Sequence, residues 1–115
     1  MKYLMLLMSE GENPPWDEQS PEQQAAAMQQ HDDFGQACAA HPEVNILAAE
    51  ALDGAPTTVR TRGGVQTVAE GPYAEAVEQL GGFYLIETPD LATLLELTAL
   101  LPPYDLQLSP VGEEH

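Results

Sequence analysis

Two side chains in this sequence are suited to general acid and base catalysis, His31 and Glu70. His31 lies in the middle of an apolar stripe with helical spacing, and Glu70 begins a Glu-Gly-Pro-Tyr turn. An imidazole exchanges protons near neutral pH, and a carboxylate beside it would fix its tautomer and raise its pKa. The pair therefore predicts His31 as a base with Glu70 as its orienting partner. The structural alternatives are a core histidine satisfied by one hydrogen bond and a carboxylate that only belongs to the turn.

The remaining reactive side chains give weaker signals. Arg60 could orient an acidic substrate, although an arginine on an exposed strand is more often solvated or salt-bridged. Cys38 shares the helix face of His31 but lies two turns away, which favours a buried structural cysteine. His31 and Glu70 supply only two metal ligands, and the sequence has neither a zinc-type Cys/His spacing nor a glycine-rich phosphate loop. We therefore expect no metal and no cofactor.

The composition is strongly acidic. The 115 residues include 19 Asp and Glu against 3 Lys and Arg, which gives a formal net charge of -16. Such a surface opposes binding to nucleic acid and to anionic membranes, which require basic patches, and it is most simply explained by solubility. The apolar run at residues 1–8 is too short for a signal core or a membrane span. Because Cys38 is the single cysteine, no intramolecular disulfide can form, and we expect a cytoplasmic protein.

The elements that must position these residues form one domain over residues 1–111, followed by a disordered tail at 112–115. The first helix is predicted over residues 21–40, because Ser20, Pro21 and Gln23 form a capping-box start and Pro42 prevents its continuation. Its inward stripe is Ala27, His31, Phe34 and Cys38. A second helix is predicted over 91–101, and strands over 2–8, 44–52, 83–88 and 104–110.

A hairpin is predicted between the second and third of these strands. Residues 57–61 and 65–69 flank Gly63-Gly64, which is typical of a two-residue turn, and this register places Arg60 opposite Thr67. The resulting order is a split βαβ pattern with an inserted hairpin, which indicates a ferredoxin-like α+β fold. Strands 2–8 and 83–86 are apolar on both faces, whereas helices cover one face of such a sheet. We therefore expect a homodimer in which a second copy covers the other face.

The sequence resembles the YCII-related proteins, specifically the branch named for an Asp-Gly-Pro-Phe motif. The resemblance covers nearly the whole chain and is carried by the segments Met1–Leu7, His31–Phe34, Thr57–Arg60, Glu70–Glu75 and Glu78–Ile86. It implies a ferredoxin-like fold that pairs as a dimeric α/β barrel, with a histidine on the first helix and an aspartate at the head of the turn as a catalytic pair. His31 matches that histidine.

The turn departs from the family pattern in several positions. Glu70 stands at the aspartate position, Tyr73 replaces the phenylalanine, and Ala76-Val77 replace a Thr-Lys pair, so an anion-binding lysine is missing. We expect Arg60, Pro72 and Tyr73 to contact a small-molecule ligand near the catalytic pair. The leading hypothesis is lyase-like or isomerase-like acid/base catalysis on a small organic molecule, in a pocket between the first helix and the sheet. The alternative is a non-enzymatic ligand-binding or accessory module.

Overall fold

The computed structural model describes residues 1–11, 16–52, 55–73 and 80–112 of the chain. A short 3-10 helix, η1 (Trp16–Glu18), precedes the first α-helix. The other elements are β1 (Lys2–Gly11), α1 (Pro21–Ala40), β2 (Asn45–Ala51), β3 (Thr57–Arg62), β4 (Val65–Glu70), β5 (Leu80–Glu87), α2 (Leu91–Thr98) and β6 (Tyr104–Pro110).

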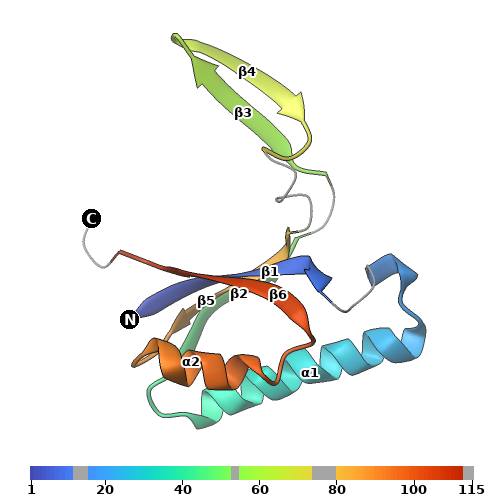
Figure 1. Ribbon diagram of the computed structural model, residues 1–115, viewed down its shortest axis with the longest axis vertical. Coiled ribbons are helices and arrows are strands. Elements are labelled where there is room, and N and C mark those ends of the chain that lie inside the picture. Colours follow the sequence, from blue (N-terminus) through green and yellow to red (C-terminus); the bar gives the residue numbers. More distant parts are fainter. Residues whose placement is uncertain (12–15, 53–54, 74–79, 113–115) are drawn as a thin grey trace.

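Four strands form one antiparallel sheet in the order β2-β5-β1-β6. Each crossover passes through a helix, and α1 and α2 lie side by side on the same face of this sheet (Figure 1). This α+β architecture is compatible with the ferredoxin-like fold, as predicted. Its consequence is that one sheet face is covered by helices and the other is not.

The first helix begins and ends where its sequence signals place it. The Ser20 side chain accepts the Gln23 N–H, the Gln23 side chain accepts the Ser20 N–H, and Pro21 occupies the first turn, so the predicted capping box is confirmed. The second helix is three residues shorter than predicted. Leu101 donates its N–H to the Thr98 carbonyl in a tighter turn, because the residue before a proline is disfavoured in the helical region.

The main core lies between the helices and the sheet. Pairing of β1 with β5 sets Tyr3 opposite Ile86 and Met5 opposite Tyr84 on the helix-facing side. The buried residues that pack together here are Tyr3, Met5, Phe34, Cys38, Val44, Ile86, Leu94 and Leu101.

Gly82 allows β2 and β5 to approach closely at the sheet edge. A Cβ atom at this position would lie 2.9 Å from the Glu50 carbonyl oxygen, which is closer than real Cβ contacts. The requirement is for space rather than for an unusual backbone angle, so any larger side chain must push the two strands apart.

The opposite face of the sheet is also apolar. The same strand register pairs Leu4 with Leu85 and Leu6 with Phe83, and all of these side chains are half-buried in the single chain. The prediction that β1 and β5 carry apolar side chains on both faces is therefore confirmed. We call the surface formed by Leu4, Leu6, Phe83 and Leu85 the open face.

The inserted hairpin forms a separate two-stranded sheet from β3 and β4. Thr57 pairs with Glu70 and Arg60 pairs with Thr67, which confirms the predicted register. Gly63 and Gly64 have φ angles of 58° and 79°, and a two-residue turn with two positive φ angles matches the right-handed twist of the strands it joins.

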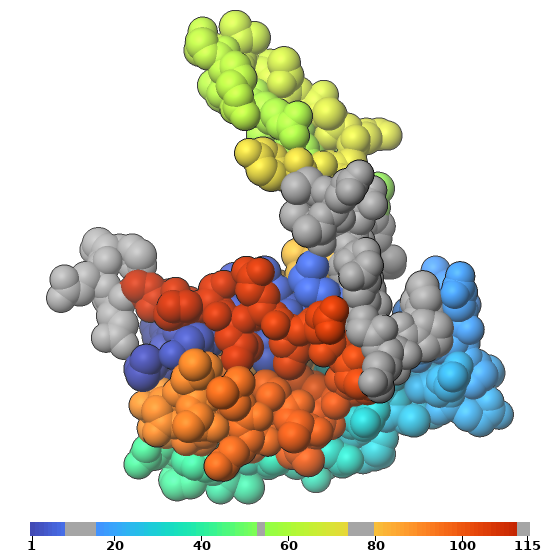
Figure 2. Space-filling model, in the orientation of Figure 1, coloured from blue at the N-terminus to red at the C-terminus, as the bar shows by residue number. Residues whose placement is uncertain are grey.

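This hairpin, which we call the arm, projects from the body on the side opposite the helices (Figures 1 and 2). The Cα radius of gyration is 16.2 Å, whereas a compact domain of this length has about 13 Å. The arm accounts for this extended shape. In the described part of the chain, no helix is long and apolar enough to cross a membrane. Of the predicted tail, residues 113–115 lie outside the described residues.

Candidate functional site

His31 is held between two tyrosine hydroxyl groups. Its Nδ1 atom lies 2.7 Å from the Tyr84 hydroxyl oxygen, and its Nε2 atom lies 3.2 Å from the Tyr104 hydroxyl oxygen. The Tyr84 ring also stacks on the imidazole, with centroids 6.0 Å apart and planes inclined by 18°. Both ring nitrogens of this half-buried histidine are therefore satisfied inside the protein.

Three elements that are distant in sequence bring this group together. His31 comes from the middle of α1, Tyr84 from the helix-facing side of β5, and Tyr104 from the first residue of β6. Phe34, one turn after His31, packs edge-on against Tyr84 with ring centroids 5.1 Å apart. This contact fixes the Tyr84 ring, so its hydroxyl is pre-positioned for the imidazole.

The two bond lengths favour one tautomer of His31. A neutral imidazole has one N–H donor and one acceptor nitrogen, so one tyrosine donates to the ring and the other accepts from it. Bonds with an O–H donor are typically about 2.7–2.8 Å long, and N–H···O bonds are about 2.9–3.0 Å long. The shorter bond fits Tyr84 donating to Nδ1, and the longer bond fits Nε2–H donating to Tyr104. The hydroxyl proton of Tyr104 then remains available to a further acceptor.

Burial decides the charge state of the group. It lowers the pKa of His31 below the ordinary value of 6.5, since desolvation penalises the imidazolium. A neighbouring carboxylate would shift this pKa in the opposite direction, so the pairing of His31 with Glu70 stays a prediction. Burial also raises the pKa of Tyr84 and of Tyr104, so both hydroxyls keep their protons at neutral pH.

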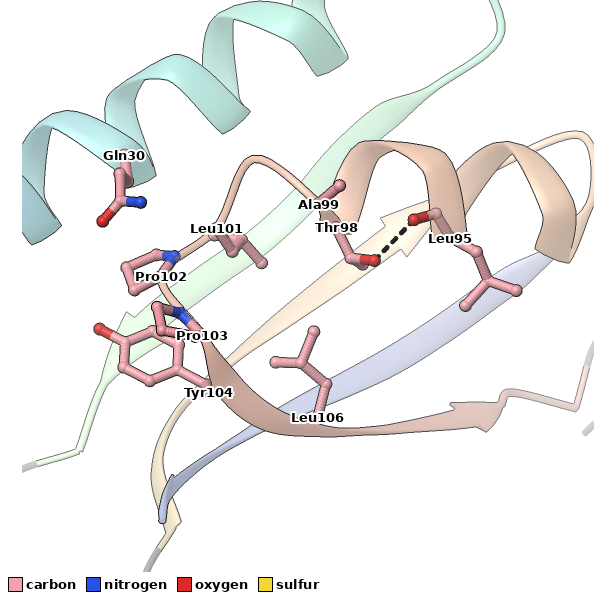
Figure 3. A pocket seen from close by; sticks show the side chains of 9 residues that line it. All are labelled: Gln30, Leu95, Thr98, Ala99, Leu101, Pro102, Pro103, Tyr104 and Leu106. Carbon is pink, nitrogen blue, oxygen red and sulfur yellow. Dashed lines mark hydrogen bonds between the residues drawn. The ribbon is translucent and has the colours of Figure 1, made fainter. Parts of the chain in front are cut away.

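An open pocket of about 510 Å³ lies beside this group, between α2 and the start of β6. Tyr104 takes part in both the pocket and the histidine site, because it lines the pocket and its hydroxyl is hydrogen-bonded to His31. Figure 3 shows the Tyr104 ring next to Pro102 and Pro103, with Leu106 and the α2 residues farther along the wall. The lining residues are Gln30, Leu95, Thr98, Ala99, Leu101, Pro102, Pro103, Tyr104 and Leu106, and none of them is charged.

The other predicted site residues lie on the arm and its base. Glu70 ends β4, opposite Thr57, and is exposed. Arg60 donates to the Tyr73 carbonyl oxygen over 3.1 Å, and its guanidinium lies 5.1 Å from the centre of the Tyr73 ring. Pro72 immediately precedes Tyr73 in the turn and is half-buried.

The structure thus brings Arg60, Pro72 and Tyr73 together but does not bring Glu70 to His31. The arm and α1 lie on opposite sides of the four-stranded sheet (Figure 1), so within one chain the sheet separates the carboxylate from the imidazole. The hydrogen-bond partners of His31 are tyrosines instead. The sequence did not predict Tyr84 and Tyr104 as partners of His31. The one available signal concerned Tyr104, which alternates with Leu106 and Leu108 and therefore shares a face of β6 with them.

Cys38 is buried in the core, where burial raises the pKa of its thiol, in keeping with the predicted structural role. Among the described residues, no group of three or more His, Cys, Asp and Glu side chains is gathered as metal ligands would be.

The fold and site define a small α+β domain with a tyrosine-bracketed histidine between its first helix and its sheet. Residues 1–109 match the family model of the YCII-related domain. The chain therefore belongs to the YCII-related family. A comparison with curated proteins gives no match.

Proposed function

We propose that this YCII-related protein catalyses acid/base chemistry on a small, uncharged organic molecule bound beside Tyr104. The observation that carries the proposal is the shared position of Tyr104, which lines an open pocket and is hydrogen-bonded to a histidine of lowered pKa. A half-buried histidine with both ring nitrogens hydrogen-bonded, one of them to a residue that lines a pocket, is suited to positioning a proton donor.

In this mechanism His31 acts through Tyr104. The Nε2–H group donates to the Tyr104 oxygen, and the Tyr104 hydroxyl donates to an oxygen atom of the bound molecule. A water molecule or hydroxide ion in the open pocket removes the α-proton of the bound molecule, which breaks a C–H bond and places negative charge on the oxygen. Tyr104 transfers its proton to that oxygen, which gives the enol, and the resulting phenolate is stabilised by Nε2–H. In the reverse direction the carbon takes a proton from water, and the enol O–H proton returns to the Tyr104 phenolate. Tyr84 holds the required tautomer by donating to Nδ1.

The charge distribution supports an uncharged ligand. The pocket wall has apolar and neutral polar side chains, and the chain as a whole has a formal charge of -16. Of the basic residues, Arg60 and Arg62 are on the arm, across the sheet from α2 (Figure 1). An anion would therefore enter a negative potential and meet no cation in the wall.

We place the chain in the Asp-Gly-Pro-Phe branch of the family, as a cytoplasmic homodimer that pairs through its open face in a dimeric α/β barrel. Glu70, together with Arg60, Pro72 and Tyr73, would then contribute to a site only from a second subunit, because the sheet separates them from His31 within one chain. The half-buried apolar residues of the open face support this pairing.

Proton exchange on a neutral ketone tests the proposal. Cyclohexanone in D2O slowly exchanges its α-protons with solvent when its carbonyl is polarised, and NMR follows both this exchange and shifts of the Tyr104 and Leu106 resonances. We expect the wild-type protein to accelerate exchange, and Tyr104→Phe to reduce the rate at least about tenfold, as for loss of one oxyanion donor. Tyr3→Phe is the matched control, since Tyr3 packs in the core and does not line the pocket.

The outcomes separate catalysis from binding. Binding at Tyr104 with exchange at the buffer rate would support the alternative, a ligand-binding or accessory module. Benzoate, an anion of similar ring size, should bind at least about tenfold more weakly than cyclohexanone, because of the negative potential. Equal binding of benzoate would contradict the charge argument, and no binding of either molecule would contradict the pocket.

A further inference from the structure

The arm leaves a row of apolar side chains exposed. Val59 and Val68 face each other across the two strands and are 53% and 65% exposed. An isolated two-stranded hairpin is marginally stable at best in water, and stable hairpins normally pack one face against something else. Within the sheet topology, β3 and β4 pair with each other and not with the four-stranded sheet.

The two faces of the arm differ in what covers them. Because side chains alternate along a strand, Thr58 and Arg60 lie on one face, and Val59 lies on the other with its partner Val68. The first face makes contacts with the chain itself at the base of the arm: Thr58 donates to the Gly71 carbonyl over 2.6 Å, and Arg60 contacts Tyr73. Gly71 has a φ angle of 113°, which only glycine adopts readily, so this turn can fold back on the arm. The valine face is the one left to a partner.

The length of the arm restricts where that partner lies. Strands of six residues span roughly 20 Å, whereas two sheets packed face to face are only about 10 Å apart. The arm rises on the open-face side of the sheet (Figure 1), so a second copy packed there leaves no room for the arm between the sheets. The arm must therefore pass outside the space between the two sheets and lie against an edge strand of the second copy's four-stranded sheet.

Charge favours another copy of this chain as the occupant. The chain has three Lys and Arg residues in total, and the arm carries two of them, Arg60 and Arg62. The body of a second copy is strongly acidic, with Glu50 and Asp105 on the two edge strands of its sheet. The two arginines lie on the face of the arm opposite Val59, so they make the arm as a whole less negative and do not contact the edge directly. A less negative arm beside an acidic edge reduces the repulsion between two chains of the same net charge.

We propose that the β3–β4 arm of each subunit clasps an edge of the four-stranded sheet of a second copy, with Val59 and Val68 against it. The inference rests on the homodimer proposed above and adds the element that locks it. A two-fold axis makes the contact reciprocal, so each subunit gives one arm and receives one. The exposed valine pair of the single chain becomes part of the interface core.

Matched variants of the arm test the clasp. Val→Thr keeps the shape and the strand preference of the side chain and removes its apolar character. We expect Val59→Thr/Val68→Thr to raise the dimer dissociation constant, measured by sedimentation, by about tenfold or more, as for the loss of buried apolar area from an interface. Val65→Thr is the control, because Val65 is equally exposed but pairs with Arg62 on the other face. Its dissociation constant should stay within about twofold of the wild type.

A direct measurement accompanies the variants. In a dimer of one isotope-labelled and one unlabelled chain, filtered NOEs should connect the Val59 and Val68 methyl groups with protons of the unlabelled chain. A stable dimer without these NOEs, or one unaffected by the double variant, overturns the clasp and leaves the sheet-to-sheet dimer standing. A wild-type monomer at micromolar concentration overturns both. The cyclohexanone exchange assay measures catalysis at Tyr104 independently of the arm. Loss of the clasp or of the dimer can therefore be distinguished from failure of the proposed catalysis.

Discussion

Tyr84→Phe removes one oxygen atom from the His31 site and leaves the rest of the packing in place. The phenyl ring retains its edge-on contact with Phe34 and its stacking on the imidazole. What is lost is the 2.7 Å hydrogen bond to Nδ1. The variant therefore isolates the energetic effect of a single hydroxyl group.

The expected effect follows from the burial of the two partners. Leaving a buried polar atom without its partner costs about 1–3 kcal/mol. His31 and Tyr84 are half-buried, so water partly replaces the bond, and we expect the free energy of unfolding to fall by about 1–2 kcal/mol. Tyr104→Phe should cost less, about 0.5–1 kcal/mol, because its bond is longer, at 3.2 Å, and the open pocket admits water.

Urea unfolding measures these differences, with all variants at one protein concentration because association contributes to stability. Tyr73→Phe is the control: this tyrosine is 63% exposed, and the change should stay within about 0.5 kcal/mol of the wild type. The 15N shifts of the His31 ring report the tautomer in the same samples, and Nε2 should carry the proton. An unchanged stability in Tyr84→Phe, or a proton on Nδ1, would refute the hydrogen-bond assignment.

Two further predictions follow from burial and from close packing. The pKa of His31 is lowered in the folded state, so the unfolded chain binds more protons below about pH 6.5. The contribution of His31 to stability is then complete above this pH and is lost as the pH falls toward the folded pKa. His31→Gln should flatten this part of the stability curve, and an equally steep curve would contradict the assignment. Gly82→Ala should destabilise the fold by about 1–3 kcal/mol, because its Cβ would lie 2.9 Å from the Glu50 carbonyl oxygen. Gly35→Ala, in α1 with nothing within 4 Å of the new Cβ, should instead stabilise it by about 0.5–1 kcal/mol, and thermal unfolding of both variants tests the pair.

Much of the architecture could be predicted from local sequence signals. The capping box at Ser20 and the proline after α1 define a helix whose bounds agree with the prediction, since these signals act within a few residues. The Gly63-Gly64 pair made the pairing of β3 with β4 predictable, because a two-residue turn allows its two strands only one alignment. The two-faced apolar pattern of β1 and β5 identified the centre of the sheet. The second helix was predicted too long, because its last residues can form a tighter turn with the same sequence.

The partners of His31 were decided by the tertiary structure. Tyr84 and Tyr104 lie 53 and 73 residues from it in the sequence, and the register of three antiparallel pairings and the packing of α1 bring them to one point. Glu70 is closer along the chain than Tyr84 is, but a sheet lies between it and the imidazole. The sequence by itself determined that a histidine occupies the inner face of α1. Only the tertiary structure decided that its neighbours are hydroxyl groups and that burial lowers its pKa, because both depend on contacts between distant segments.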